Sequence, residues 1–219
     1  MGCSAPGKPI GDIRRMLSAH RGFTLIEVAI AMVILGLLIG LGAELLPMLV
    51  KQNKLKDDRM LVREARTAII GYALATGKLP YASSDANGTQ TTGRLSGYLP
   101  WATLGITGRD PYNTTLFYAT DSHLANTTTL TQFKQRLGDL ISGTLTPDLF
   151  CDGTNIRAAF IVVSAGENLR ADAPNDDNNN RIIDINDDSQ FASPTSPITS
   201  SYDDILEVTG LTYLYGLIP

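Results

Sequence analysis

One apolar segment near the N-terminus constrains this chain more than any other feature. Residues 23–50 read FTLIEVAIAMVILGLLIGLGAELLPMLV, and Glu27 and Glu44 are the only charged residues among them. A helix of this length can cross a hydrocarbon core of about 30 Å. Residues 1–22 carry four basic residues and one acid. We therefore expect the N-terminus to stay in the cytoplasm and the rest of the chain to be exported.

The flanks of this segment differ from those of a secretory signal peptide. A secretory signal has its small-residue cleavage site after the apolar run. Here the run is followed by Lys51-Gln52-Asn53-Lys54, with no A-x-A-like site. The small residue Gly22 instead precedes the run and directly follows Arg21.

The stretch Arg21-Gly22-Phe23-Thr24-Leu25-Ile26-Glu27, followed by an apolar helix, resembles the prepilin motif of type IV pilins and type II secretion pseudopilins. The resemblance implies that a membrane-embedded aspartic peptidase cuts between Gly22 and Phe23 and methylates the new amino terminus of Phe23. It also implies that Glu27 pairs with the amino terminus of a neighbouring subunit during filament assembly. A charge in the membrane costs roughly 2.5–3.5 kcal/mol, which favours such a pairing role for Glu27.

The same resemblance implies location and partners. The chain is expected in the bacterial inner membrane, crossing it once, and then in a filament, with its head in the periplasm or at the cell surface. The implied partners are the prepilin peptidase and methylase, other pilin or pseudopilin subunits, the inner-membrane assembly platform and membrane lipid. The mature length favours a pilin or a minor component. Both a pilus and a secretion pseudopilus remain open.

Four regions are expected along the chain: a leader (1–22), a membrane-spanning or filament-core helix (23–50), an amphipathic continuation of that helix (51–79) and an exported head (80–219). In the second part of the helix, Leu55, Val62, Ile69 and Ala73 share one face. The basic residues of 51–66 are expected to pair along the helix with Asp57, Asp58 and Glu64.

The head is expected to be α+β: a long N-terminal helix packed on a small antiparallel sheet of three or four strands. The predicted elements are strands at Thr115–Thr120 and Ala158–Ser164, a helix at Thr129–Ser142 and a last strand region at Ile205–Leu217, interrupted by Gly210.

An acidic loop in the head offers a candidate calcium site. Oxygen-bearing side chains occupy positions 1, 3, 5, 9 and 12 of a calcium loop: Asp176, Asn178, Asn180, Asp184 and Asp187. Arg181 stands where such loops have glycine, and Asp187 replaces the usual glutamate, so a solvated loop rich in Asp and Asn is the alternative. The resemblance to pseudopilins, which carry calcium near their C-terminal strands, makes Asp203 and Asp204 alternative ligands.

The chain lacks the residue pattern of an enzyme. His123 and Cys151 are the only histidine and cysteine after residue 22. We expect His123 to lie in an exposed loop and Cys151 to be a small buried thiol. Without the leader the chain has 14 basic and 21 acidic residues, and this acidic balance argues against a role in nucleic-acid binding. The alternative function is a membrane-anchored exported enzyme or binding domain that does not assemble into a filament.

Overall fold

The computed structural model describes residues 2, 22–153, 155–176, 183, 190–199 and 201–219. The chain divides into two compact units, Met1–Met48 and Leu49–Pro219. The helices are α1 (Leu25–Thr76), α2 (Trp101–Leu104), α3 (Ser122–Ala125), α4 (Leu130–Ser142) and α5 (Leu211–Leu217). The strands are β1 (Ser96–Tyr98), β2 (Phe117–Thr120), β3 (Phe150–Cys151), β4 (Ile156–Ser164), β5 (Gln190–Phe191) and β6 (Ile205–Gly210).

Helix α1 has 52 residues and continues through Pro47. Its end is fixed by Gly77, whose backbone takes the left-handed conformation with a φ of 72°. A Cβ at this position would lie 2.5 Å from the backbone nitrogen of Leu130, so only glycine fits where the helix end meets the start of α4.

The amphipathic part of α1 buries the face that its periodicity predicts. Val62, Ile69 and Ala73 are almost completely buried in the second unit, as is Ala65 beside them. They belong to a core that also contains Phe133 and other residues of α4. The long helix packed on the head is thus confirmed, as is the predicted α+β class.

Among the described residues, the sheet of the head has six strands, with the order β1-β2-β4-β3-β5 and with β6 paired to β4. The pairs of β4 with β2, β3 and β6 are antiparallel, whereas β3 and β5 run parallel. The sheet is therefore mixed and larger than the three or four antiparallel strands expected from the sequence.

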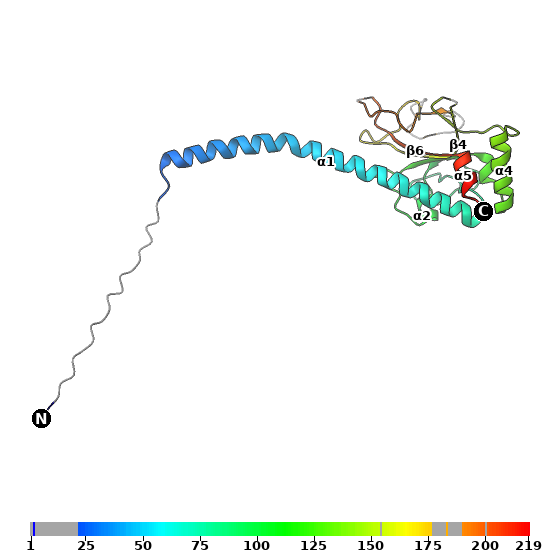
Figure 1. Ribbon diagram of the computed structural model, residues 1–219, viewed down its shortest axis with the longest axis horizontal. Helices are drawn as coiled ribbons and strands as arrows, with labels where there is room; N and C mark the ends of the chain where they lie inside the picture. Colours follow the sequence, from blue (N-terminus) through cyan, green and yellow to red (C-terminus); the bar gives the residue numbers. More distant parts are fainter. Residues whose placement is uncertain (1, 3–21, 154, 177–182, 184–189, 200) are drawn as a thin grey trace. The chain divides into compact units, whose positions relative to one another are not determined.

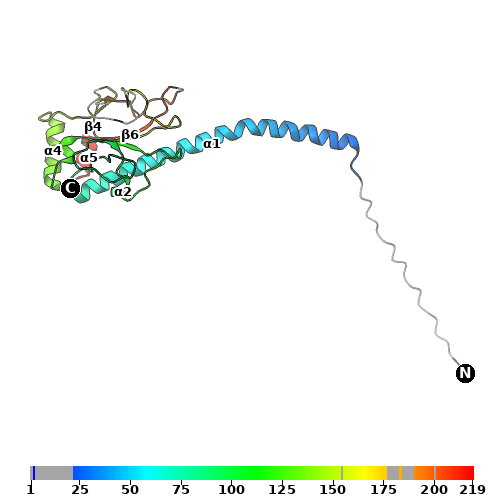
Figure 2. The ribbon, with the colours of Figure 1, turned by 180° about the vertical axis from the view of Figure 1, so that it is seen from behind.

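Strand β4 lies between two cores. Phe160 and Val162 face the core that includes α1 and α4, and the alternate residues Ile161 and Val163 face a second core. The second core includes Cys151, confirming the expected buried thiol, and Phe191 of β5. Figures 1 and 2 show a layer of loops on the face of β4 and β6 opposite the helices. Burial on both faces explains why residues 158–163 of β4 are a continuous apolar run.

Two predictions for the head were wrong. The region Ile205–Leu217 is not strand throughout, because β6 ends at Gly210 and α5 follows. Leu211, Leu214 and Ile218 are buried at helical spacing in the core beside α4. His123 does not lie in an exposed loop: it lies in the short helix α3, where its side chain is 28% exposed and contacts Asp121.

Candidate functional site

The residues of the prepilin-like motif lie at the start of α1. Gly22, Phe23 and Thr24 precede the helix, and Glu27 lies in its first turn. The backbone amide of Glu27 donates to the Thr24 hydroxyl at 3.3 Å, and the amide of Val28 donates to the Thr24 carbonyl at 3.1 Å. Thr24 thus caps the helix, and an acidic side chain in the first turn suits its positive end.

Residues 22–27 of the motif are exposed within their own unit. The side chain of Phe23 is 78% exposed, and the Gly22–Phe23 bond precedes the first helical residue. An exposed bond outside the helix is open to a peptidase, because no helical hydrogen bond has to break before cleavage.

The first half of α1 exposes apolar side chains around its whole circumference. Leu25, Ile34 and Leu38 are each more than half exposed, and the other large apolar residues up to Val50 are also exposed. This stretch is long and apolar enough to cross a membrane. A surface of this kind requires lipid or other apolar helices as its environment.

A second candidate site is an acidic cluster in the head. Asp172 lies in the loop after β4, and Asp203 and Asp204 lie just before β6. One carboxylate oxygen from each of the three lies within 4.8 Å of the others. Gly166 permits this approach, since a Cβ there would lie 2.4 Å from the Asp203 carbonyl oxygen.

Hydrogen bonds hold the cluster but leave two of its oxygens without partners. The amide of Asp172 and the Asn175 side chain both donate to Asp204 Oδ2 at 2.8 Å. The amide of Asp203 donates to Asp172 Oδ2 at 2.9 Å. In the described part of the chain, the buried Oδ1 atoms of Asp203 and Asp204 accept no hydrogen bond.

The charge of this cluster is costly to bury. Asp204 is only 4% exposed, and burial together with the charges of Asp172 and Asp203 raises its pKa to about 7. Burial also raises the pKa of Asp203. Calcium takes six to eight oxygen ligands, and the converging carboxylates of Asp172, Asp203 and Asp204 have the chemistry to supply part of such a set.

The predicted calcium ligands are only partly described by the structure. The amide of Asp176 donates to the Asp172 carbonyl, so the start of the predicted loop lies beside the cluster. The other four predicted ligands, Asn178, Asn180, Asp184 and Asp187, lie outside the described residues. Sequence reasoning missed Asp172, because it precedes the loop pattern and no sequence spacing relates it to Asp203.

A third group of polar residues joins α1 to the head. Asp58 of α1 is completely buried, and the Ser164 hydroxyl lies 2.7 Å from its Oδ2 and 3.2 Å from Oδ2 of Asp110. Burial is the main cause that raises the pKa of Asp58 to about 6. The expected pairing of Asp58 along the helix was therefore wrong. Lys51 and Arg66 likewise pair with Glu167 and Glu207 outside the helix.

The helix and the head together define a single-pass membrane-anchored protein with an α+β head. Residues 17–43 match the family model of the prokaryotic N-terminal methylation motif. This motif is the hallmark of the prepilin-type signal of type IV pilins and pseudopilins, so the chain carries that signal. No curated protein and no solved structure matches the chain.

Proposed function

We propose that this chain is the precursor of a structural subunit of a type IV pilus or a type II secretion pseudopilus. The prepilin peptidase cuts it between Gly22 and Phe23 and methylates Phe23. The mature subunit then enters a helical filament through the apolar half of α1. The observation that carries this proposal is the match of residues 17–43 to the methylation motif, located where the accessible Gly22–Phe23 bond meets an exposed apolar helix.

The exposed apolar surface of α1 and the charge of Glu27 would together drive assembly. In the membrane the apolar side chains of α1 contact lipid, and in a filament they contact the same surface of other subunits. Glu27 lies one helical turn from Phe23, so it can pair with the methylated amino terminus of a neighbouring subunit. Such a pair neutralises a charge that the apolar surroundings penalise.

The head is the exported part. Its acidic cluster favours a type II secretion pseudopilus over a pilus, because pseudopilins carry calcium near their C-terminal strands. We propose that Asp172, Asp203 and Asp204 hold a calcium ion, with Asp176 and its loop close by. The ion would neutralise carboxylates whose charge is otherwise buried, and it would fix the loop after β4 to the start of β6.

Calcium binding is tested by the thermal unfolding of the full chain in detergent. Calcium is expected to raise the midpoint temperature of the wild type, because the ion binds only the folded state. Asp204→Asn keeps the shape of the side chain and removes its charge, so the shift should be lost. Asp152→Asn, at an exposed turn, is the matched control and should retain the shift. An equal shift in Asp204→Asn and in the wild type would contradict this site.

Filament assembly is tested in the host by shearing filaments from cells and by chemical crosslinking in intact membranes. The proposal predicts that the protein occurs in the sheared fraction or forms a ladder of crosslinked subunits, in both cases only when the prepilin peptidase is active. A protein that stays monomeric under both conditions would contradict the proposal. That result would favour the anchored domain without a filament.

A further inference from the structure

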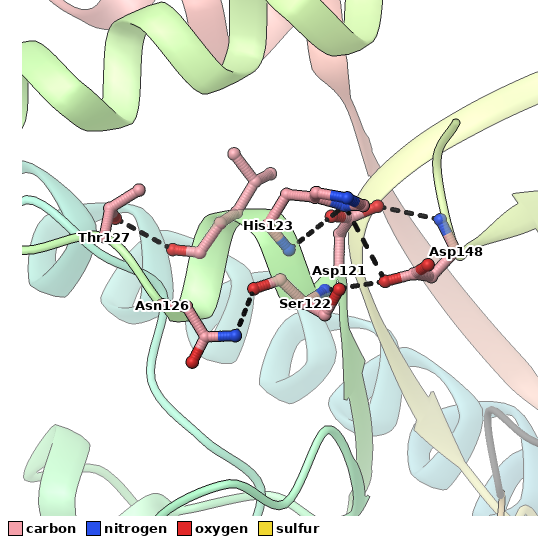
Figure 3. Close-up of polar contacts among 7 residues, drawn as sticks. Asp121, Ser122, His123, Asn126, Thr127 and Asp148 are labelled. Atoms are coloured by element: carbon pink, nitrogen blue, oxygen red, sulfur yellow. Dashed lines mark hydrogen bonds and ion pairs between the residues drawn. The ribbon is translucent and has the colours of Figure 1, made fainter. Parts of the chain in front are cut away.

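Three side chains of the head converge at a place that the proposed filament function does not use. Asp121 and His123 lie at the start of α3, and Asp148 lies just before β3. Nδ1 of His123 lies 3.0 Å from Oδ1 of Asp121 and 3.9 Å from Oδ2 of Asp148. Figure 3 shows the imidazole and the two carboxyl groups pointing toward one another from two separate segments. One ligand atom from each of the three lies within 4.8 Å of the others.

The charges at this place lack a strong positive partner. The Asp121 side chain is completely buried, and burial raises its pKa, with the nearby carboxylate of Asp148 adding to the effect. In the described part of the chain, neither carboxylate forms an ion pair with a lysine or an arginine. Among the described residues, the imidazole of His123 is the only basic side chain that lies close to both carboxylates. Two neighbouring carboxylates in a partly buried place favour a cation between them.

Backbone amides hold both carboxyl groups in place. The amide of His123 donates to Asp121 Oδ1 at 2.9 Å, and the amide of Asp148 donates to Asp121 Oδ2 at 2.8 Å. The amide of Ser122 donates to Asp148 Oδ2 at 2.9 Å. These hydrogen bonds orient the oxygens toward the imidazole, as the outer shell of a metal site orients its ligands.

We propose that His123, Asp121 and Asp148 bind a divalent transition-metal ion of the zinc type, with water completing its coordination. A site with one imidazole nitrogen and two carboxylate oxygens suits such an ion, whereas calcium prefers oxygen ligands alone. Zinc lies about 2.0–2.2 Å from its ligands, so two ligand atoms of a tetrahedral site are about 3.4 Å apart. The observed separations of 3.0 and 3.9 Å fall on either side of this value.

The ion can reach the ligands from solvent, and it competes with a proton for Nδ1 of His123. The side chains of His123 and Asp148 are 28% and 33% exposed, so one side of the site faces solvent. Binding requires a lone pair on Nδ1 of His123. The hydrogen of the imidazole is then on Nε2, and metal binding weakens as the solution becomes more acidic.

The probe for this site is Co²⁺, because its visible absorption reports the number and type of its ligands. The full chain is purified in detergent with an affinity tag that contains no histidine, and all samples carry His20→Gln, so that His123 is the only histidine. The proposal predicts saturable Co²⁺ binding that Zn²⁺ displaces and Ca²⁺ does not. His123→Gln and Asp148→Asn should each weaken binding at least as much as loss of an outer-shell partner does, which is about 10–100-fold.

The matched control is Asp152→Asn, which lies at an exposed turn outside both acidic clusters and should leave Co²⁺ affinity unchanged. Circular dichroism of each variant checks that the fold is kept, and both substitutions retain side chains of similar size and polarity. Wild-type Co²⁺ affinity in His123→Gln would overturn the proposal, as would displacement of Co²⁺ by Ca²⁺. Because this experiment does not involve Gly22 or Glu27, its failure would leave the filament function untouched.

Discussion

Glu27 and Glu44 are both glutamates in one apolar segment, but the proposed assembly gives a role only to Glu27. Glu27 lies in the first turn of α1, close to the amino terminus that cleavage would create. Glu44 lies 17 residues further along the chain, well beyond the reach of that terminus. These two residues therefore form a natural pair of test and control positions.

We predict that Glu27→Leu is still cleaved, because the substitution leaves the Gly22–Phe23 bond unchanged. Its incorporation into filaments should fall by about tenfold or more, which corresponds to about 1.4 kcal/mol or more of lost pairing free energy. Glu44→Leu should assemble nearly as well as the wild type. The measurement is the amount of subunit in sheared filaments relative to membranes. Equal incorporation of Glu27→Leu and the wild type would contradict a pairing role.

Asp58 is a second residue whose environment predicts a measurable effect. This residue of α1 is completely buried against Ser164 at the end of β4. Its Oδ1 accepts no hydrogen bond from the described residues. Its pKa is raised from 3.8 to about 6, chiefly by burial. A raised folded-state pKa means that the folded protein holds this proton more tightly than the unfolded chain. Its contribution to stability is complete below pH 3.8 and is lost as the pH rises through about 6.

Asp58→Asn should therefore stabilise the head at neutral pH, because asparagine resembles the protonated acid and still accepts from Ser164. The gain above pH 6 should approach about 3 kcal/mol as an upper estimate, and it should vanish near pH 4. Asp57→Asn, at the exposed neighbouring position, is the control and should change little. The free energy of unfolding is measured from pH 4 to pH 8 in the presence of a chelator. A gain that did not depend on pH would contradict the assigned cause.

At the scale of elements, local patterns predicted the long or strongly periodic segments well. Val62, Ile69 and Ala73 recur at helical spacing along α1, and all three pack in the core of the head. Helix α4 begins after Thr129, whose side chain accepts from the backbone amide of Gln132, and ends before Gly143. Both ends carry ordinary capping residues, which is why the prediction of Thr129–Ser142 agrees so closely with the structure.

Elements that depend on distant contacts could not be predicted. Nothing local indicates that β3 pairs in parallel with β5, because each has only two residues. The sequence of α5, LTYLYGL, contains two tyrosines and a threonine and resembles a strand, yet contacts with α4 select the helix. The acidic cluster has the same limitation, since residues 31 positions apart, Asp172 and Asp203, are brought together by the tertiary fold and not by local sequence.

The helical face of α5 gives a prediction at this scale. Leu214 is completely buried, whereas Leu217, three residues further on in the same helix, is 39% exposed. Leu214→Ala should lower the free energy of unfolding by about 2–5 kcal/mol, the usual cost of an emptied core position. Leu217→Ala should cost well under about half of that, because less apolar area is lost. Chemical denaturation of both variants measures the difference. Equal losses would contradict the helical packing of this segment.

At the scale of the whole molecule, two regions have opposite requirements. The apolar half of α1 has no core of its own to pack in, so it requires lipid or other subunits. The head has two apolar cores, and acidic residues outnumber basic ones in the chain after the leader. Both features suit an exported, water-facing domain. Processing at the boundary of the leader would remove four basic residues and convert a membrane precursor into an assembly-competent subunit.

The intact mass of the protein purified from the membranes of its own host tests this account most directly. The account predicts the mass of residues 23–219, which are 197 of the 219 residues, plus one methyl group on Phe23. Fragmentation of the purified protein should locate that methyl group on the amino terminus. The mass of the full 219-residue chain, from cells with an active prepilin peptidase, would contradict the account and leave an anchored domain that does not enter a filament.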